Sequence, residues 1–160
     1  MKRVLVPALL LLLAGCGQQV RDAGGRLEEN GVAVTVTLHP GPDGGREIVA
    51  SFVPVEAGFH LYSKDLPADG VHGLGIPTAL DVSGDLRADG PPVTESPVRM
   101  LRLANLDVEL PVYPDGPVTF TLPVEQTGSS RAEVVVSYAA CSEVRCLMPV
   151  TGRKIPLPFR

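Results

Sequence analysis

Short stretches in which apolar and polar side chains alternate recur along most of the chain. In the clearest of them, residues 32–38, valine or leucine occupies every second position and alanine or threonine the positions between. A period of two places alternate side chains on opposite faces of a strand, so this pattern predicts a β-strand with one buried face. Further strands are expected over the apolar runs at residues 48–55, 59–63, 79–82, 98–103, 108–112, 118–124, 132–139 and 154–159.

The segments between these runs are rich in turn-forming residues. The chain contains 17 glycines and 16 prolines, many of them placed between the apolar runs, as in residues 39–45, 89–92 and 114–117. No window of a dozen residues shows the 3.6-residue repeat of an amphipathic helix. Many short strands separated by turns predict an all-β fold, an immunoglobulin-like antiparallel β-sandwich over residues 31–160. A segment of this length fits one domain.

The N-terminus has the pattern of an export signal. Lys2 and Arg3 precede an apolar stretch, residues 4–13, which is too short to cross a bilayer as a permanent helix. The stretch ends in Leu13-Ala14-Gly15-Cys16, which resembles the bacterial lipobox, where cleavage occurs before an acylated cysteine. We therefore expect residues 1–15 to be a lipoprotein signal peptide and Cys16 to be the site of lipid attachment. The alternative is an ordinary signal peptide in which Cys16 is incidental.

Residues 16–30 are polar, contain glycine and lack hydrophobic periodicity, so they are expected to form a lipidated, flexible tether. No other stretch is apolar enough over its length to span a membrane. The protein is therefore expected outside the cytoplasm, anchored to a bacterial membrane through its lipid, in the periplasm or at the cell surface.

The net charge is −4, and loss of Lys2 and Arg3 leaves 12 basic against 18 acidic residues, or −6. This acidic balance argues against nucleic acid as a partner.

The cysteines carry the clearest chemical information. The lipobox uses one of three, which leaves Cys141 and Cys146, separated by four residues, in a compartment where disulfides persist. A β-branched run leads into Cys141, and a hairpin turn over residues 142–145 would set the two cysteines opposite each other, within disulfide range. A disulfide that closes so short a loop stabilises a fold by only about 2 kcal/mol, less than a bridge between distant segments. A redox-active pair is therefore favoured over a structural staple.

Two other interpretations of the pair stay open at this point. Met148, two residues beyond Cys146, could join the two cysteines in a soft site for Cu(I), which would make the protein a copper-handling lipoprotein. Alternatively, the chain could be a non-redox binding module whose disulfide is structural. Nothing in the sequence resembles a Ser/His/Asp triad or a phosphate-binding glycine loop, so hydrolytic enzymes are not indicated.

The cysteine segment and three others resemble the amino-terminal periplasmic domain of the DsbD thiol:disulfide interchange protein family. Tyr138–Pro149 (YAACSEVRCLMP) is similar to the family's aromatic, small-residue, cysteine, spacer, cysteine, proline pattern. Gly58–Ser63 (GFHLYS) is similar to its glycine-aromatic-His-x-Tyr segment, and Gly75–Thr78 (GIPT) to its Gly-x-Pro-Thr turn. Tyr113–Val124 matches the strand that precedes the cysteine hairpin. These segments occur in the family's order.

The resemblance implies an immunoglobulin-like domain with the cysteines on a C-terminal hairpin. It also implies thiol–disulfide exchange, with reducing equivalents passed from a membrane thiol reductant of the DsbD/CcdA type to exported thioredoxin-like proteins. Cys146 would form the mixed disulfide and Cys141 would resolve it. The redox-active disulfide would be the only cofactor, and any enzymatic activity would be that of a protein-disulfide oxidoreductase. The electrons could serve the repair of misformed disulfides or cytochrome c maturation.

The sequence departs from the family in two respects. Full-length members continue into a membrane domain and a thioredoxin-like domain, whereas here separate proteins are expected to perform those steps. The family also shields its cysteines with a cap loop that bears an aromatic residue. The corresponding segment is Ala104–Val108, with Leu106 in place of the aromatic side chain.

Three residues are candidates for the lining of the cysteine site. His60 and Tyr62 are two apart on an expected strand and therefore point to one face, where they could line the cysteine pocket or pack on a sheet edge. Arg145, inside the turn, could stabilise a neighbouring thiolate or be a solvated loop charge.

Overall fold

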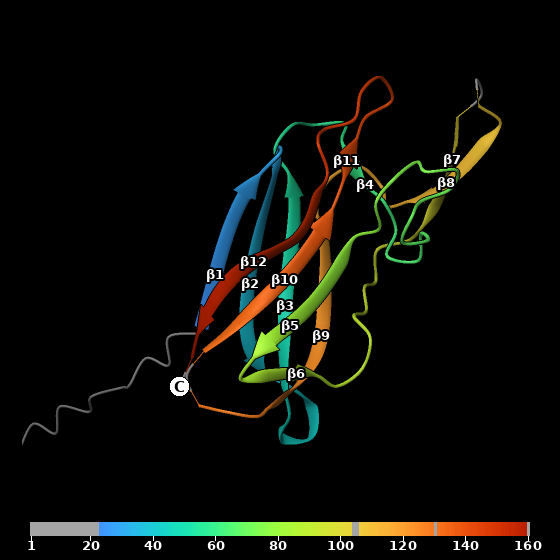
Figure 1. Cartoon of the computed structure of the whole chain (residues 1–160). Coiled ribbons are helices and arrows are strands. Elements are labelled where there is room, and N and C mark those ends of the chain that lie inside the picture. The colour runs from blue at the N-terminus through green and yellow to red at the C-terminus, as the bar shows by residue number, and fades with distance from the viewer. Residues whose placement is uncertain (1–22, 104–105, 130, 160) are drawn as a thin grey trace, which may run out of the picture.

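The computed structural model describes residues 23–103, 106–129 and 131–159, and these residues form strands and turns without an α-helix (Figure 1). The strands are β1 (Ala23–Glu29), β2 (Val32–Pro40), β3 (Arg46–Pro54), β4 (His60–Leu61), β5 (Ala79–Gly84), β6 (Leu86–Ala88), β7 (Arg99–Leu103), β8 (Val108–Val112), β9 (Val118–Gln126), β10 (Arg131–Tyr138), β11 (Ala140–Cys141) and β12 (Val150–Pro158), with a 3₁₀ turn at Pro42–Gly44.

Two antiparallel sheets face each other and make a sandwich. One sheet has the strand order β1-β2-β3-β9-β6 and the other the order β12-β10-β5. All strand pairs are antiparallel, and the alternation predicted for residues 32–38 is observed, since every second side chain of β2 is buried. The all-β, immunoglobulin-like sandwich predicted from the sequence is therefore confirmed.

The core between the sheets is apolar and closely packed. Aliphatic side chains from both sheets meet there, and the ring of Phe52 contacts those of Phe120 and Tyr138 edge-on, with centroids 5.6 and 5.8 Å apart. Such edge-to-face pairs add to the free energy gained from burial of the rings. This core supplies the rigid body on which the cysteine hairpin is mounted.

The expectation of a flexible tether over residues 16–30 is wrong for its second half. Residues 23–29 form β1, which pairs with β2 along its whole length from Ala23↔Leu38 to Glu29↔Val32. The strand was missed because Leu27 is its only large apolar side chain, and backbone pairing at a sheet edge leaves no hydrophobic pattern. Gly25 allows β1 to approach the other sheet, since a Cβ there would lie 2.7 Å from the Pro156 carbonyl oxygen of β12.

The signal peptide, Cys16 and the first part of the tether lie outside the described residues. Within the described part of the chain, no helix is of the length and apolarity needed to cross a membrane. Two short strands, β6 and β11, were also not predicted, because two or three residues are too few to show a period.

One end of the sandwich carries additional elements that do not belong to the two main sheets. Here β4 pairs with β11, and β7 pairs with β8 to form a hairpin. The end of β8 and the residue after it also pair with the β4 region, through a Tyr62↔Val112 bridge and a hydrogen bond from the Tyr113 amide to the Leu61 carbonyl. A second, smaller apolar cluster fills this end, and Tyr62 and Cys141 belong to it.

Candidate functional site

The two cysteines form a disulfide at the base of a tight hairpin. Cys141 ends β11 and is bridged to Cys146, with their Cα atoms 4.0 Å apart. The turn between them is closed by a hydrogen bond from the Ser142 amide to the Arg145 carbonyl, at 2.8 Å. The Ser142 hydroxyl also accepts a hydrogen bond from the Arg145 amide. The hairpin geometry predicted from the four-residue spacing is therefore observed.

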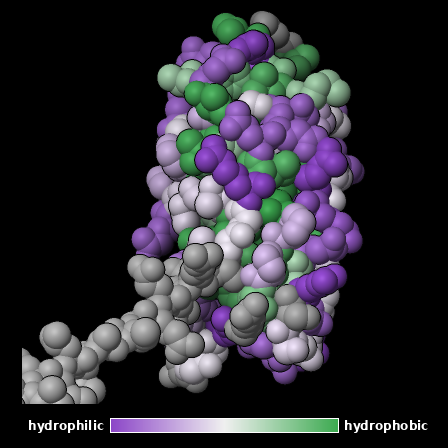
Figure 2. All heavy atoms as spheres, turned by 90° about the vertical axis from the view of Figure 1, so that its left-hand side faces the viewer, coloured by the Kyte–Doolittle hydropathy of each residue, from purple (hydrophilic) through white to green (hydrophobic). Residues whose placement is uncertain are grey.

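The two sulfurs of this disulfide have different surroundings. The Cys141 residue is 3% exposed and belongs to the smaller apolar cluster, whereas Cys146 is exposed. Several residues near Cys146 are also exposed, including Val144 at 91% and Met148 at 74%, whereas Leu147 is half-buried. Figure 2, seen from the β1 side, shows hydrophobic and hydrophilic side chains intermingled at the upper end of the molecule. A reagent from solvent can therefore reach Cys146 and not Cys141.

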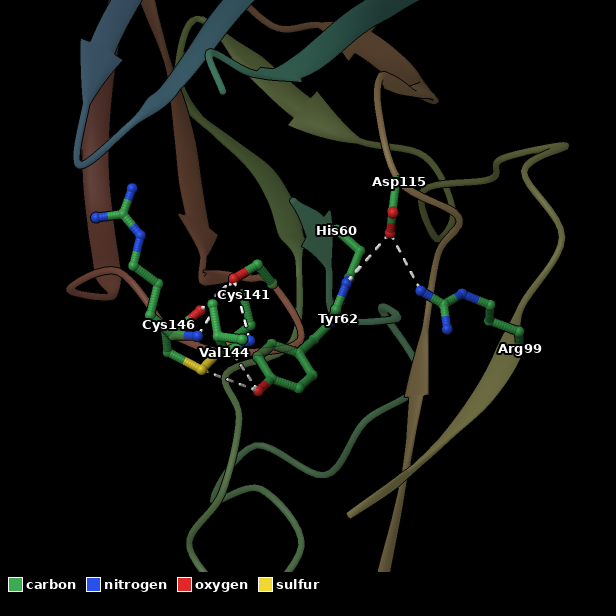
Figure 3. A network of polar contacts seen from close by, with 9 residues as sticks. His60, Tyr62, Arg99, Asp115, Cys141, Val144 and Cys146 are labelled. Atoms are coloured by element: carbon green, nitrogen blue, oxygen red, sulfur yellow. Dashed lines mark hydrogen bonds and ion pairs between the residues drawn. A yellow bond between two sulfur atoms is a disulfide. The ribbon is translucent and has the colours of Figure 1, made fainter. Parts of the chain in front are cut away.

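Tyr62 lies directly against the disulfide (Figure 3). Its hydroxyl is 3.0 Å from Sγ of Cys141 and 3.9 Å from Sγ of Cys146. The backbone of Tyr62 is held by the bridge to Val112 and by the Thr78 hydroxyl, which donates to the Tyr62 carbonyl at 2.7 Å. Burial raises the pKa of Tyr62, so the hydroxyl remains a donor throughout the neutral range.

His60 lies directly across from Cys141 in the β4–β11 pair and is 1% exposed. Its Nδ1 is 3.3 Å from Oδ1 of Asp115, which also accepts a hydrogen bond from Arg99 at 3.1 Å (Figure 3). The edge of the His60 ring meets the Tyr62 ring, with centroids 6.5 Å apart. Burial is the main cause that lowers the pKa of His60, and Arg99 lowers it further, while Asp115 and Glu143 act in the opposite direction.

The third candidate, Arg145, contacts Glu56 and Phe59 rather than the sulfurs or Tyr62. Its guanidinium lies over the Phe59 ring, 5.2 Å from the centroid, and forms an ion pair with Glu56. The structure therefore brings Tyr62 to the disulfide and His60 next to Tyr62, while Arg145 contacts the segment between β3 and β4.

The segment expected to act as a cap lies at the tip of the β7–β8 hairpin. Ala104 and Asn105 are outside the described residues, and Leu106 is 58% exposed. Cys146 is exposed although the described part of this hairpin contributes Val108, Leu110 and Val112 to the cluster around Cys141. The described part of the hairpin therefore belongs to the same apolar cluster as Cys141.

For a metal site the described residues offer few ligands. Met148, the proposed third ligand for Cu(I), has a largely exposed side chain. No group of three or more His, Cys, Asp or Glu side chains with the geometry to bind a metal occurs in the part of the chain that the structure describes.

Sequence reasoning did not identify Asp115 and Arg99 as residues near the site. Asp115 stands in the segment Pro114-Asp115-Gly116-Pro117, which has the composition of a turn and gives no sign of a buried partner. Only the backbone pairing between this turn and β4, including a hydrogen bond from the Gly116 amide to the Phe59 carbonyl, brings it to His60.

Comparisons with known proteins identify the fold. No family model matches the chain, and no curated protein matches it in sequence. Among solved structures, the chain is similar to the N-terminal periplasmic domain of ScsB from Proteus mirabilis, with a TM-score of 0.56, 15% identity and 86% of this chain aligned. The domain shares the ScsB N-terminal fold. The aligned part is 51% of the ScsB chain, so the present chain spans about half the length of that relative.

A second structure is also similar, the N-terminal domain of DsbD from Neisseria meningitidis in its reduced form, with a TM-score of 0.42 and 14% identity over 85% of this chain and 90% of that one. The ScsB match supports, at the level of the fold, the DsbD N-terminal-like domain expected from the sequence. The roles of individual site residues are a separate question, which rests on the geometry.

Proposed function

We propose that this protein is an exported, membrane-tethered thiol–disulfide exchange protein. It relays reducing equivalents from a membrane thiol reductant of the DsbD/CcdA type to extracytoplasmic thioredoxin-like proteins. The observation that carries the proposal is the unequal exposure of the two sulfurs, with Cys146 open to solvent and Cys141 buried against Tyr62. The similarity to a periplasmic domain supports it.

The chemistry follows from this asymmetry. When the protein is reduced, a thiolate of the donor attacks Sγ of Cys146, the Cys141–Cys146 bond breaks, and Cys141 leaves as a thiolate beside the Tyr62 hydroxyl. The second thiol of the donor then releases Cys146 and leaves the donor oxidised. In the second half of the cycle, Cys146 attacks the disulfide of an acceptor, and Cys141 resolves the mixed disulfide. Each transfer moves two electrons, and no group other than the cysteines changes its oxidation state.

Anchoring through Cys16 is part of the proposal. Lipid attachment would keep the domain at the surface of the membrane that holds its donor, where encounter does not depend on diffusion through the compartment. Cys16→Ser is expected to release the protein from the membrane fraction and to abolish incorporation of labelled fatty acid. Unchanged fractionation and labelling would disprove the anchor and leave the exchange chemistry untouched.

The reduction potential of the cysteine pair tests the exchange function. It is measured on the chain with Cys16→Ser by thiol alkylation and gel shift across a dithiothreitol or glutathione series. A value near about −200 mV lies in the range of known exchange proteins, whereas a value below about −300 mV is typical of structural disulfides. The second result, together with no exchange against any thioredoxin-like protein, would overturn the proposal.

The two cysteines themselves provide a matched pair of variants. Cys141→Ala leaves the exposed thiol without its resolving partner, so a mixed disulfide with an oxidised thioredoxin-like protein should accumulate. Cys146→Ala leaves only the buried thiol and should give no adduct. Adducts of equal yield from both variants would contradict the assigned roles.

A further inference from the structure

A buried histidine pairs across the β4–β11 ladder with the cysteine that carries the buried sulfur. His60 and Cys141 are direct partners in the antiparallel β4–β11 pair. Side chains directly opposite each other in such a pair share one face, with Cβ atoms about 4.5–5.5 Å apart. Tyr62, two residues after His60 and just beyond β4, lies on the same face and contacts both: its hydroxyl is 3.0 Å from Sγ of Cys141, and its ring meets the His60 ring.

One nitrogen of His60 is without a partner. Nε2 is buried and makes no hydrogen bond to any described residue. The other nitrogen, Nδ1, lies 3.3 Å from the Asp115 carboxylate, which can only accept, so Nδ1 carries the hydrogen and Nε2 carries the lone pair. A buried nitrogen with no partner weakens a fold, and its presence calls for an explanation.

Reduction of the disulfide places a negative charge on Sγ of Cys141. When the bond to Cys146 breaks, the electron pair goes to Sγ of Cys141, which is 3% exposed. An unpaired buried anion is unfavourable, and the Tyr62 hydroxyl supplies only one hydrogen bond to it. The other charged groups that act on His60 are Arg99 from β7, Asp115 from the turn after β8 and Glu143 from the hairpin tip, and the two carboxylates favour a positive imidazole.

We propose that His60 takes up a proton on Nε2 when the disulfide is reduced, so that the reduced site holds a buried Cys141 thiolate and a His60 imidazolium as a pair. In the step, a donor dithiol is oxidised to its disulfide, the Cys141–Cys146 bond receives two electrons, the proton on Nε2 comes from solvent, and Cys146 ends as the thiol or thiolate that solvent pH dictates. His60 is thus a positioning residue that acts through Cys141, because its positive charge stabilises the Cys141 thiolate. It keeps Cys141 in the nucleophilic form that resolves the mixed disulfide.

This inference concerns the resolving sulfur of the exchange reaction proposed above, but it can be tested with dithiothreitol alone. The decisive measurement is the pH titration of the His60 ring by NMR, on the full chain with Cys16→Ser, before and after reduction. His60 is expected to be neutral at neutral pH in the oxidised protein and protonated in the reduced protein. A ring that is neutral in both states would overturn the proposal, whatever the potential of the pair.

The thiolate itself supplies the second readout. In the reduced chain, His60→Phe removes the proton site, keeps a planar ring and also removes the unpartnered nitrogen. The thiolate absorbance at neutral pH that belongs to Cys141 should then fall about tenfold, as expected for loss of one neighbouring opposite charge. His72→Asn is the matched control, because His72 is exposed in another turn and has φ 53°, a conformation that asparagine accepts. Superimposable curves for His60→Phe and the parent chain would overturn the proposal.

Asp115→Asn gives the same test at an exposed position where folding is not at risk, since the Asp115 side chain is 51% exposed. Loss of the carboxylate should lower the protonated fraction of His60 in the reduced protein and lower the thiolate signal with it. No change in either signal would contradict the proposed ion pair between His60 and Cys141. If the measured potential is that of a structural disulfide while His60 still gains its proton on reduction, the proposed function fails and this inference stands.

Discussion

The two apolar clusters of this domain are built in different ways. The sandwich core is formed by long strands, such as the nine-residue β2, β3 and β9, and its side chains are almost wholly aliphatic or aromatic. The cluster around Tyr62 and Cys141 is built from the five-residue strands of the β7–β8 hairpin, two-residue strands and isolated bridges, and it includes the sulfur of Cys141. We therefore expect substitutions in the sandwich core to change stability and substitutions around the disulfide to change the rate of its reduction.

The largest expected effect is a loss of stability from the sandwich core. Phe52→Ala removes a ring that is 0% exposed and packs against Phe120 and Tyr138, and should lower the free energy of unfolding by about 3–5 kcal/mol. Urea denaturation of the oxidised protein measures it. Val55→Ala is the control, because Val55 is 58% exposed and its loss should change stability by less than about 0.5 kcal/mol. Equal effects would contradict the assignment of stability to the core.

At the disulfide, we expect a substitution to change the rate of reduction and to leave stability nearly unchanged. Tyr62→Phe removes the hydroxyl that lies 3.0 Å from Sγ of Cys141 and so weakens stabilisation of the leaving thiolate. Reduction by dithiothreitol should slow roughly tenfold, as expected for one hydrogen bond to a developing charge, while the urea midpoint changes little.

Tyr113→Phe is the matched control for that rate, since the Tyr113 hydroxyl accepts a hydrogen bond from the Lys64 amide. Its reduction rate should equal that of the parent chain. If both phenylalanine variants are reduced at the parent rate, Tyr62 is only a packing residue.

The dependence of stability on alkaline pH tests the contact between Tyr138 of the core and Glu29 of β1. Burial raises the pKa of Tyr138 to about 12, and its hydroxyl donates to the Glu29 carbonyl at 3.0 Å. The unfolded tyrosine loses its proton near its ordinary pKa of about 10, so above that pH the folded state binds more protons and stability falls as pH rises. Urea midpoints should therefore drop between about pH 10 and pH 12, and Tyr138→Phe should reduce the drop. An equal drop in the variant would assign the effect to other groups.

The smallest expected effect lies at the hairpin tip. Arg145→Gln breaks an exposed ion pair with Glu56 and the contact with the Phe59 ring, and should cost less than about 1 kcal/mol. Thermal unfolding measures it against Arg87→Gln, which breaks the exposed pair with Glu125. A rate of dithiothreitol reduction that changes as much as in Tyr62→Phe would mean that Arg145 acts on the sulfurs after all.

The extent to which the sequence predicts this structure follows the same division. The alternation of apolar and polar residues predicts the long strands of the core, and the spacing of the two cysteines predicts the hairpin. β1 was not predictable, because a strand bonded to one neighbour at a sheet edge needs no apolar repeat. The contact between His60 and Asp115 was not predictable either, since it joins residues far apart in the sequence through the backbone pairing of a turn with a two-residue strand.

The direction of β1 determines how far the reactive sulfur stands from the start of the domain. β1 begins at Ala23 and ends at Glu29, and the next residue, Asn30, donates to the Pro149 carbonyl beside the cysteine hairpin. The start of β1 and the cysteine hairpin therefore lie at opposite ends of the sandwich (Figure 1). Seven residues of strand span about 23 Å at roughly 3.3 Å each. If Cys16 carries the proposed lipid anchor, the length of the sandwich would separate Cys146 from the anchored end of the domain, and partners would have to present their own cysteines at that distance.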